Sequence, residues 1–133
     1  MDIQKAFDSV DHDFFISALK NFGFGTNFIP WVKILLKSQE SCVMNGGFST
    51  VFFNLERGTR QGDPISAYFF IIIMEIFFTM IRDKSDINGI NICNFEYKLT
   101  SYADDTTCFT SDLNSIKSIM DTFDIFSNYS GSK

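Results

Sequence analysis

Proline, cysteine and basic residues are scarce in this sequence, and each scarcity excludes a class of structure. The only two prolines are Pro30 and Pro64, so no proline-rich linker divides the 133 residues into separate domains. The three cysteines, Cys42, Cys93 and Cys108, show no C-x-x-C spacing, which argues against a zinc site and against a closed disulfide framework. We therefore expect one domain with buried, reduced thiols.

The shortage of positive charge bears on function. The chain has 11 Lys and Arg residues against 16 Asp and Glu residues, which gives a net charge of −5. Proteins that bind nucleic acid normally carry a basic surface that neutralises phosphates. The composition alone opposes such a function, unless the acids surround metal ions and the phosphate-binding surfaces lie on other segments of a longer polypeptide.

No secretory signal opens the chain, because residues 1–5 lack a basic segment followed by an apolar stretch. We expect an intracellular protein, in the nucleus or cytoplasm, that is not secreted. The segment Ile65 to Ile81 is apolar enough to suggest a membrane span, and a small membrane protein is one alternative. Because it has about 17 residues and carries Glu75 near its middle, a buried core helix without membrane contact is favoured.

Apolar residues are plentiful, at 45% of the chain with 17 Phe, so the chain can bury a core. From Ser9 to Asn21 they recur at helical spacing, and Gly23 stands where a left-handed residue would end the helix. Thr26 can cap a second helix that continues to Leu35. The first part of the chain therefore predicts two successive helices.

The middle of the chain alternates extended and helical segments. Residues 42–44 and 51–53 flank Asn45-Gly46-Gly47, in which the Asn-Gly pair accepts the positive φ of a tight hairpin turn. Pro64 suits the first turn of a long helix from about Pro64 to Asp83. Asn88-Gly89 predicts a further turn.

Two short extended runs, residues 95–102 and 106–110, predict a hairpin with Asp104 and Asp105 at its tip. Apolar residues from Ile116 to Phe126 predict a last amphipathic helix that ends near residues 129–131. The order of elements predicts an α+β fold, in which helices pack on one face of a small antiparallel sheet.

Acidic residues provide the first hint of chemistry. Paired acids on a tight turn repel each other, and a bound cation relieves that repulsion. Mg²⁺ takes hard oxygen ligands from carboxylates and substrate phosphates, so Asp104-Asp105 can hold it, with Asp2 as a further acid about 100 residues earlier. Taken alone, Asp104-Asp105 is more often a solvated loop, and Asp2 alone says little. Helix capping is the preferred explanation for Asp8 and Asp11.

The segment from Arg57 to Ser66 combines positive charge with flexibility. Two guanidinium groups, on Arg57 and Arg60, lie beside glycines and the start of a helix. This combination suits phosphates or bases that pack against backbone. A solvated loop followed by a helix cap explains the segment equally well without further context.

Together these segments resemble, in order and spacing, motifs A, B and C of reverse transcriptases, with the start of motif D at the C-terminus. The likeness is closest to LINE-like non-LTR retrotransposons. It runs through D-x-x-K-A-F-D-x-V-D-H at Asp2 to His12, R-G-x-R-Q-G-D-P-I-S at Arg57 to Ser66, and Y-A-D-D at Tyr102 to Asp105. The resemblance covers essentially the whole chain and implies one partial palm domain, residues 1–133.

The resemblance implies RNA-directed DNA polymerase activity. Asp2, Asp104 and Asp105 match the catalytic carboxylates that hold two Mg²⁺ ions. The implied reaction is attack of a primer 3′-OH on the α-phosphate of a dNTP, with the two ions about 3.5–4 Å apart. Positioning and charge neutralisation then supply most of the catalysis.

The resemblance also implies binding roles for other residues. Phe7 matches the aromatic residue that closes the sugar pocket against a ribose 2′-OH. Gln61 and Gly62 match the loop that packs against the template and the incoming nucleotide, and Arg57 and Arg60 are the candidate nucleic-acid contacts. The implied partners are an RNA template, a DNA primer and a dNTP.

The resemblance implies that the fingers, the thumb and the first strand of motif A lie on missing parts of the chain's own polyprotein. We expect those parts to carry the basic residues, and we expect the 133-residue chain alone to lack polymerase activity. The alternative is a catalytically inactive relic of a decayed element, which keeps the motifs without the function.

Replacement of Phe7 by valine tests the predicted sugar gate. A rigid ring beneath the nucleotide leaves no room for a 2′-OH, the group that distinguishes ribose from deoxyribose. In a polymerase that contains this chain, Phe7→Val should keep dNTP use and raise rNTP incorporation, as measured by single-nucleotide primer extension. An unchanged ratio of dNTP to rNTP incorporation would count against the role.

Overall fold

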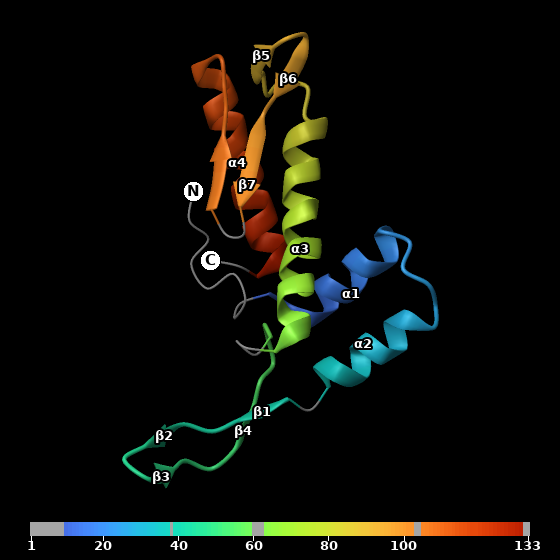
Figure 1. Ribbon diagram of the computed structural model, residues 1–133, viewed down its shortest axis with the longest axis vertical. Coiled ribbons are helices and arrows are strands. Elements are labelled where there is room, and N and C mark those ends of the chain that lie inside the picture. The colour runs from blue at the N-terminus through green and yellow to red at the C-terminus, as the bar shows by residue number, and fades with distance from the viewer. Residues whose placement is uncertain (1–9, 38, 60–62, 103–104, 132–133) are drawn as a thin grey trace.

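Helix α3 (Pro64–Asp83) forms the axis of the fold in the computed structural model, which describes residues 10–37, 39–59, 63–102 and 105–131 (Figure 1). The helix begins at the proline, and the side chain of Asp63 caps it by accepting the N–H of Ile65 at 3.1 Å. Both bounds agree with the sequence prediction.

One face of α3 supplies the centre of the hydrophobic core. Its buried side chains are Phe69, Phe70, Ile73, Met74, Phe77 and Ile81. Among the described residues one helix, Ile65–Asp83, is long and apolar enough to cross a membrane by length and composition. Burial of one face against other helices accounts for part of this apolarity, whereas Tyr68 and Ile71 on the rest of the helix are 67% and 61% exposed.

Helix α1 (His12–Asn21) crosses the N-terminal half of α3 (Figure 1). Its cap is Asp11, whose Oδ1 accepts the N–H groups of Asp13 and Phe14 at 2.8 and 3.1 Å, which confirms the predicted capping role. Asp8 lies outside the described residues. Gly23 follows the helix with a φ of +78° and confirms the predicted left-handed end.

Helix α2 (Phe28–Leu36) confirms the second predicted helix but not its predicted cap. The N-cap residue is Asn27, and its side chain makes no capping hydrogen bond. Instead, the N–H groups of Phe28 and Ile29 donate to the carbonyl of Gly25 at 3.0 and 3.4 Å. The prediction that Thr26 caps this helix is therefore wrong, because a backbone turn satisfies the first amides.

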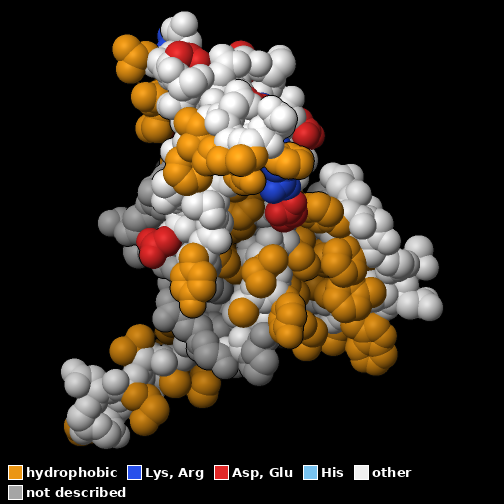
Figure 2. Space-filling view, turned by 45° about the horizontal axis from the view of Figure 1, so that its top comes forward, with side chains coloured by type: hydrophobic (Ala, Val, Ile, Leu, Met, Phe, Trp, Pro, Cys, Tyr) orange, Lys and Arg blue, Asp and Glu red, His pale blue; other side chains and the backbone are white. Residues whose placement is uncertain are grey.

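A long two-stranded ribbon follows α2 and projects from the body of the molecule (Figure 1). Strand β1 (Glu40–Ser41) pairs with β4 (Phe53–Asn54), and β2 (Met44–Asn45) pairs with β3 (Phe48–Ser49). The hairpin is confirmed, and its turn at Gly46-Gly47, with φ values of +57° and +86°, lies within the predicted turn segment. Figure 2 shows hydrophobic side chains along this ribbon and over one side of the helical body.

Strands β5 (Ile90–Ile92) and β6 (Phe95–Tyr97) form a second hairpin, which the sequence analysis missed. Its turn is Cys93-Asn94, both at positive φ, and Cys93 is exposed, so the expectation of a buried thiol is wrong there. The predicted turn at Asn88-Gly89 is also wrong, because the chain turns at residues 85–86. Gly89 is needed for close approach, since a Cβ would lie 2.4 Å from the carbonyl oxygen of Tyr97.

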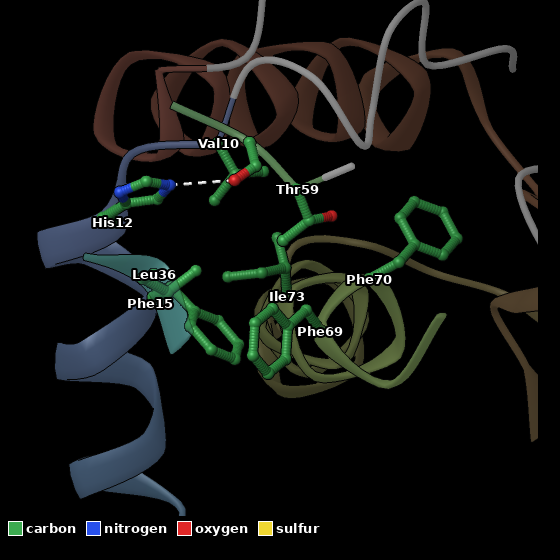
Figure 3. A pocket seen from close by; sticks show the side chains of 9 residues that line it. Val10, His12, Phe15, Leu36, Thr59, Phe69, Phe70 and Ile73 are labelled. Carbon is green, nitrogen blue, oxygen red and sulfur yellow. Dashed lines mark hydrogen bonds between the residues drawn. The ribbon is translucent and has the colours of Figure 1, made fainter. Parts of the chain in front are cut away.

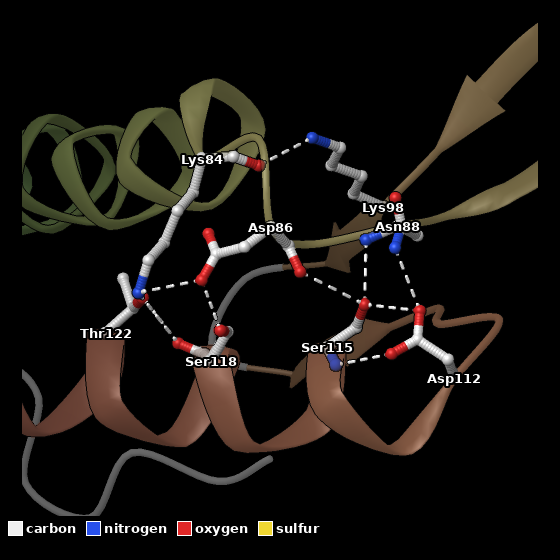
Figure 4. Close-up of polar contacts among 8 residues, drawn as sticks. All are labelled: Lys84, Asp86, Asn88, Lys98, Asp112, Ser115, Ser118 and Thr122. Carbon is white, nitrogen blue, oxygen red and sulfur yellow. Dashed lines mark hydrogen bonds and ion pairs between the residues drawn. The ribbon is translucent and has the colours of Figure 1, made fainter.

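Helix α4 (Leu113–Ser130) runs alongside α3 and is tied to the α3–β5 connection by hydrogen bonds (Figure 4). Asp112 caps the helix through the N–H of Ser115 at 2.8 Å and accepts the side-chain amide of Asn88 at 3.0 Å. Hydrogen bonds from Asn88 and Ser115 lower the pKa of Asp112 to about 2. The stabilisation from this carboxylate is therefore present above about pH 4 and is lost as the pH falls towards 2.

The predicted α+β class is confirmed. Helices α3 and α4 form the body, and α3 packs against strand β7 (Leu99–Tyr102) (Figure 1). In the described ranges, the antiparallel pairing is divided among separate two-stranded sheets instead of one continuous sheet. The predicted last helix is confirmed by α4, which ends at Gly131 in the left-handed conformation.

Phe77 offers a test of the core around α3. Its side chain is 0% exposed, and its ring lies 5.9 and 5.2 Å from the rings of Phe123 and Phe126. Phe77→Ala should lower the free energy of unfolding by about 3–5 kcal/mol in urea denaturation followed by circular dichroism. The matched control is Phe48→Ala, at a side chain 83% exposed, with an expected change within about 0.5 kcal/mol. Equal losses in the two variants would contradict the assigned core.

Candidate functional site

A tight hairpin presents the first part of the candidate site. Strand β7 pairs with β8 (Asp105–Cys108) in a register that places Leu99 opposite Cys108 and Tyr102 opposite Asp105. Only two residues connect the paired ends of the strands. The predicted hairpin is confirmed, and Asp105 opens its returning strand. Asp104 lies outside the described residues.

The β7–β8 hairpin has one face against the core and one open face. Paired residues share a face, and successive residues alternate between faces. Thr106 is 1% exposed, and Leu99 and Cys108 pack against the core. Burial raises the pKa of the Cys108 thiol, which favours its neutral form. Tyr102 and Asp105 lie on the open face and are exposed.

The carboxylate of Asp105 is a suitable metal ligand in type and position. It offers hard oxygen atoms from a paired strand, on the side of the hairpin away from the core. Within the described part of the chain, no three His, Cys, Asp or Glu side chains gather into a possible metal site. Asp2 and Asp104 lie outside that part, so the cluster of three carboxylates stays a prediction. The exposed position of Asp105 is compatible with it.

A second part of the candidate site joins two motifs that lie far apart in the sequence. Asp11 and Arg57 form an antiparallel bridge, and the N–H of Gly58 donates to the carbonyl of Val10 at 2.8 Å. The Nε2 atom of His12 lies 2.8 Å from the carbonyl oxygen of Gly58 (Figure 3). The end of the motif A match is therefore hydrogen bonded to the start of motif B, an arrangement that sequence reasoning missed.

The same segment also meets the end of α4. The backbone N–H of Asp11 donates to the carbonyl of Ser130 at 2.9 Å. Residues that match motifs A, B and D thus come together on either side of Asp11. Arg57, a predicted nucleic-acid contact, is exposed beside this junction. The other predicted binding residues, Phe7, Arg60, Gln61 and Gly62, lie outside the described residues.

A small cavity lies behind the junction (Figure 3). Its volume is about 20 Å³, which is room for roughly one water molecule. The cavity is too small for a nucleotide, so it is a gap in packing and not a substrate pocket. Its lining comprises Val10, His12, Phe15, Leu36, Gly58, Thr59, Phe69, Phe70 and Ile73.

Comparison with known proteins agrees with the motifs. A family model described as "Reverse transcriptase (RNA-dependent DNA polymerase)" matches residues 1–133. The chain is 31% identical over 113 residues to the transposon TX1 uncharacterized 149 kDa protein of Xenopus laevis, which covers 85% of this chain and 9% of that protein. It is 27% identical over 128 residues to the retrovirus-related Pol polyprotein from type-2 retrotransposable element R2DM of Drosophila melanogaster, which covers 96% of this chain and 12% of that protein.

Gly58 offers a test of the junction geometry. It is buried with a φ of +69°, a conformation that costs other residues about 1–2 kcal/mol. Gly58→Ala should lower the free energy of unfolding by about that amount in urea denaturation. Gly25→Ala is the control, because a Cβ there meets nothing within 4 Å and its φ is ordinary. A neutral Gly58→Ala would show that the junction does not hold this conformation.

Proposed function

The chain belongs to the reverse transcriptase (RNA-dependent DNA polymerase) family, and on that premise we propose that it forms the catalytic centre of RNA-directed DNA synthesis in a non-LTR retrotransposon protein. The chain spans about a tenth of the length of the relatives it matches, at 9% and 12%. The activity that we propose is therefore that of the complete protein, in which this chain would form the catalytic centre.

The observation that carries the proposal is the geometry of the β7–β8 hairpin. One face of the hairpin is buried against the core, while Asp105 stands on the open face at the start of β8. A polymerase needs carboxylates held on rigid elements and open to substrate, because a metal ligand must keep its place to within about 0.5 Å. Strand pairing and the exposed position of Asp105 support the proposal at this residue.

We infer that Asp2, Asp104 and Asp105 hold two Mg²⁺ ions, which when bound activate a primer 3′-OH and neutralise charge on the triphosphate. The contribution of Asp105 is to keep its oxygens on the open face through pairing with Tyr102. Phe7 would exclude a 2′-OH from the sugar position. Little proton transfer by protein side chains is required, because positioning and charge carry most of the catalysis.

An RNA template, a DNA primer and a dNTP are the proposed partners. A net charge of −5 repels such polyanions, so we propose that other parts of a longer protein supply most phosphate contacts. Gln61 and Gly62 would contact template and nucleotide from the motif B loop, with Arg57 and Arg60 on phosphate or base. We place this reaction inside the cell, in the nucleus or cytoplasm, and the free thiols of the chain agree with a reducing compartment.

Replacement of Asp104 by asparagine tests the carboxylate assignment. In a polypeptide that contains this chain within its full reading frame, Asp104→Asn should lower primer extension on an RNA template by at least about a hundredfold. The expected loss follows because a positioned charge that acts in the transition state contributes about 10²–10³ in rate.

The matched control is Asp124→Asn, because Asp124 is an exposed acid on α4 outside every motif. It makes the same chemical change and should leave extension within about twofold, as expected for a surface substitution. Activity of the Asp104→Asn protein within a few fold of the unsubstituted protein would refute the assignment. An equal loss in both variants would also refute it.

A further inference from the structure

We propose that His12 is a positioning residue, which sets the place of Arg57 by holding the backbone of Gly58. This inference rests on the proposed function, because it assigns His12 an effect on nucleic-acid binding. No role for His12 follows from the motif alone. The role follows from contacts between segments that lie 46 residues apart in the sequence.

Both backbone hydrogen-bonding groups of Gly58 are held by one short segment. The N–H donates to the carbonyl of Val10 at 2.8 Å, and the carbonyl accepts a hydrogen bond from Nε2 of His12 at 2.8 Å. Glycine adopts positive and negative φ with similar ease, so its conformation must be selected by its partners. The two hydrogen bonds fix the peptide planes on either side of Gly58 at a φ of +69°.

Packing around Gly58 is incomplete on one side. Gly58 and Thr59 are among the residues that line the cavity of about 20 Å³, so a few close contacts are absent there. The hydrogen bond that Gly58 donates to Val10 and the one that it accepts from His12 therefore add to packing in fixing its backbone. Loss of the imidazole donor removes the hydrogen bond that fixes the orientation of the Gly58 carbonyl.

The hydrogen bonds to Gly58 determine the backbone position of the preceding residue, Arg57. It directly precedes Gly58, is bridged to Asp11 through the backbone, and is exposed. The carboxylate of Asp11 is already engaged by two N–H groups at the start of α1. The ion pairs Arg82–Glu75, Lys84–Asp86 and Lys98–Glu96 do not involve Arg57, whose exposed guanidinium can meet a phosphate or base.

Two substitutions at His12 separate the hydrogen bond from the bulk of the ring. His12→Leu fills similar space without a donor, whereas the side-chain amide of His12→Gln places an N–H donor at the position of Nε2. In the full-length protein, His12→Leu should raise the KM for primer–template about two- to tenfold, the effect of one hydrogen bond, with kcat nearly unchanged. His12→Gln should restore the KM to within about twofold.

A double substitution tests the route through Arg57. If His12 acts by positioning Arg57, His12→Leu should have no further effect on KM in the Arg57→Ala protein. A purely structural role would lower the melting temperature and reduce activity equally in both backgrounds. Full additivity, or a His12→Gln protein as impaired as His12→Leu, would overturn the proposal.

Amide hydrogen exchange on the 133-residue chain provides a readout that does not depend on polymerase activity. The Gly58 amide should exchange faster in His12→Leu than in the unsubstituted chain or in His12→Gln, since opening of the junction exposes it. Unchanged exchange at Gly58 would refute the positioning role even in an active polymerase. If the full-length protein has no polymerase activity, the proposed function fails, and the exchange result still decides whether His12 holds Gly58.

Discussion

Burial of one face of α3 is the constraint on which the rest of the structure depends. Phe77 and Ile81 on this face are 0% exposed, and a helix with so wide an apolar face must be covered. Helix α1 covers its N-terminal half, where the rings of Phe15 and Phe69 lie 4.1 Å apart. Helix α4 and strand β7 cover other parts. Helix α2 joins the body through its contact with α1.

The two parts of the candidate site are consequences of that arrangement. Because β7 and β8 lie against the core, one face of their hairpin is buried and the other is exposed to solvent. Asp105 lies on the exposed face. Because α1 starts beside the N-terminal end of α3, the residues just before it meet the segment that leads to α3, and Val10 and His12 hold Gly58. Asp105 and the backbone of Gly58 are thus each held by packed elements of the fold.

Local chemistry made part of this structure predictable. The bounds of α3 followed from a capping acid, a proline and an apolar pattern, all of which act within a few residues. Thr26 and Asn88-Gly89 were misjudged because backbone groups and close approach of another strand decided those positions. The contact of His12 with Gly58 could not be predicted, since it depends on how distant segments approach. The roles of Asp2 and Asp104 stay predictions.

Paramagnetic broadening by Mn²⁺ tests the central claim most directly, because it reports where a divalent ion binds without any need for catalysis. In a ¹H–¹⁵N spectrum of the chain, trace Mn²⁺ should first broaden the amide signals of Tyr102 and Asp105, and excess Mg²⁺ should restore them. Asp86 and Asp112 are internal controls, because hydrogen bonds already engage their carboxylates. Broadening centred on Asp86 or Asp112, or spread evenly over the chain, would contradict a metal site at the open face of the β7–β8 hairpin.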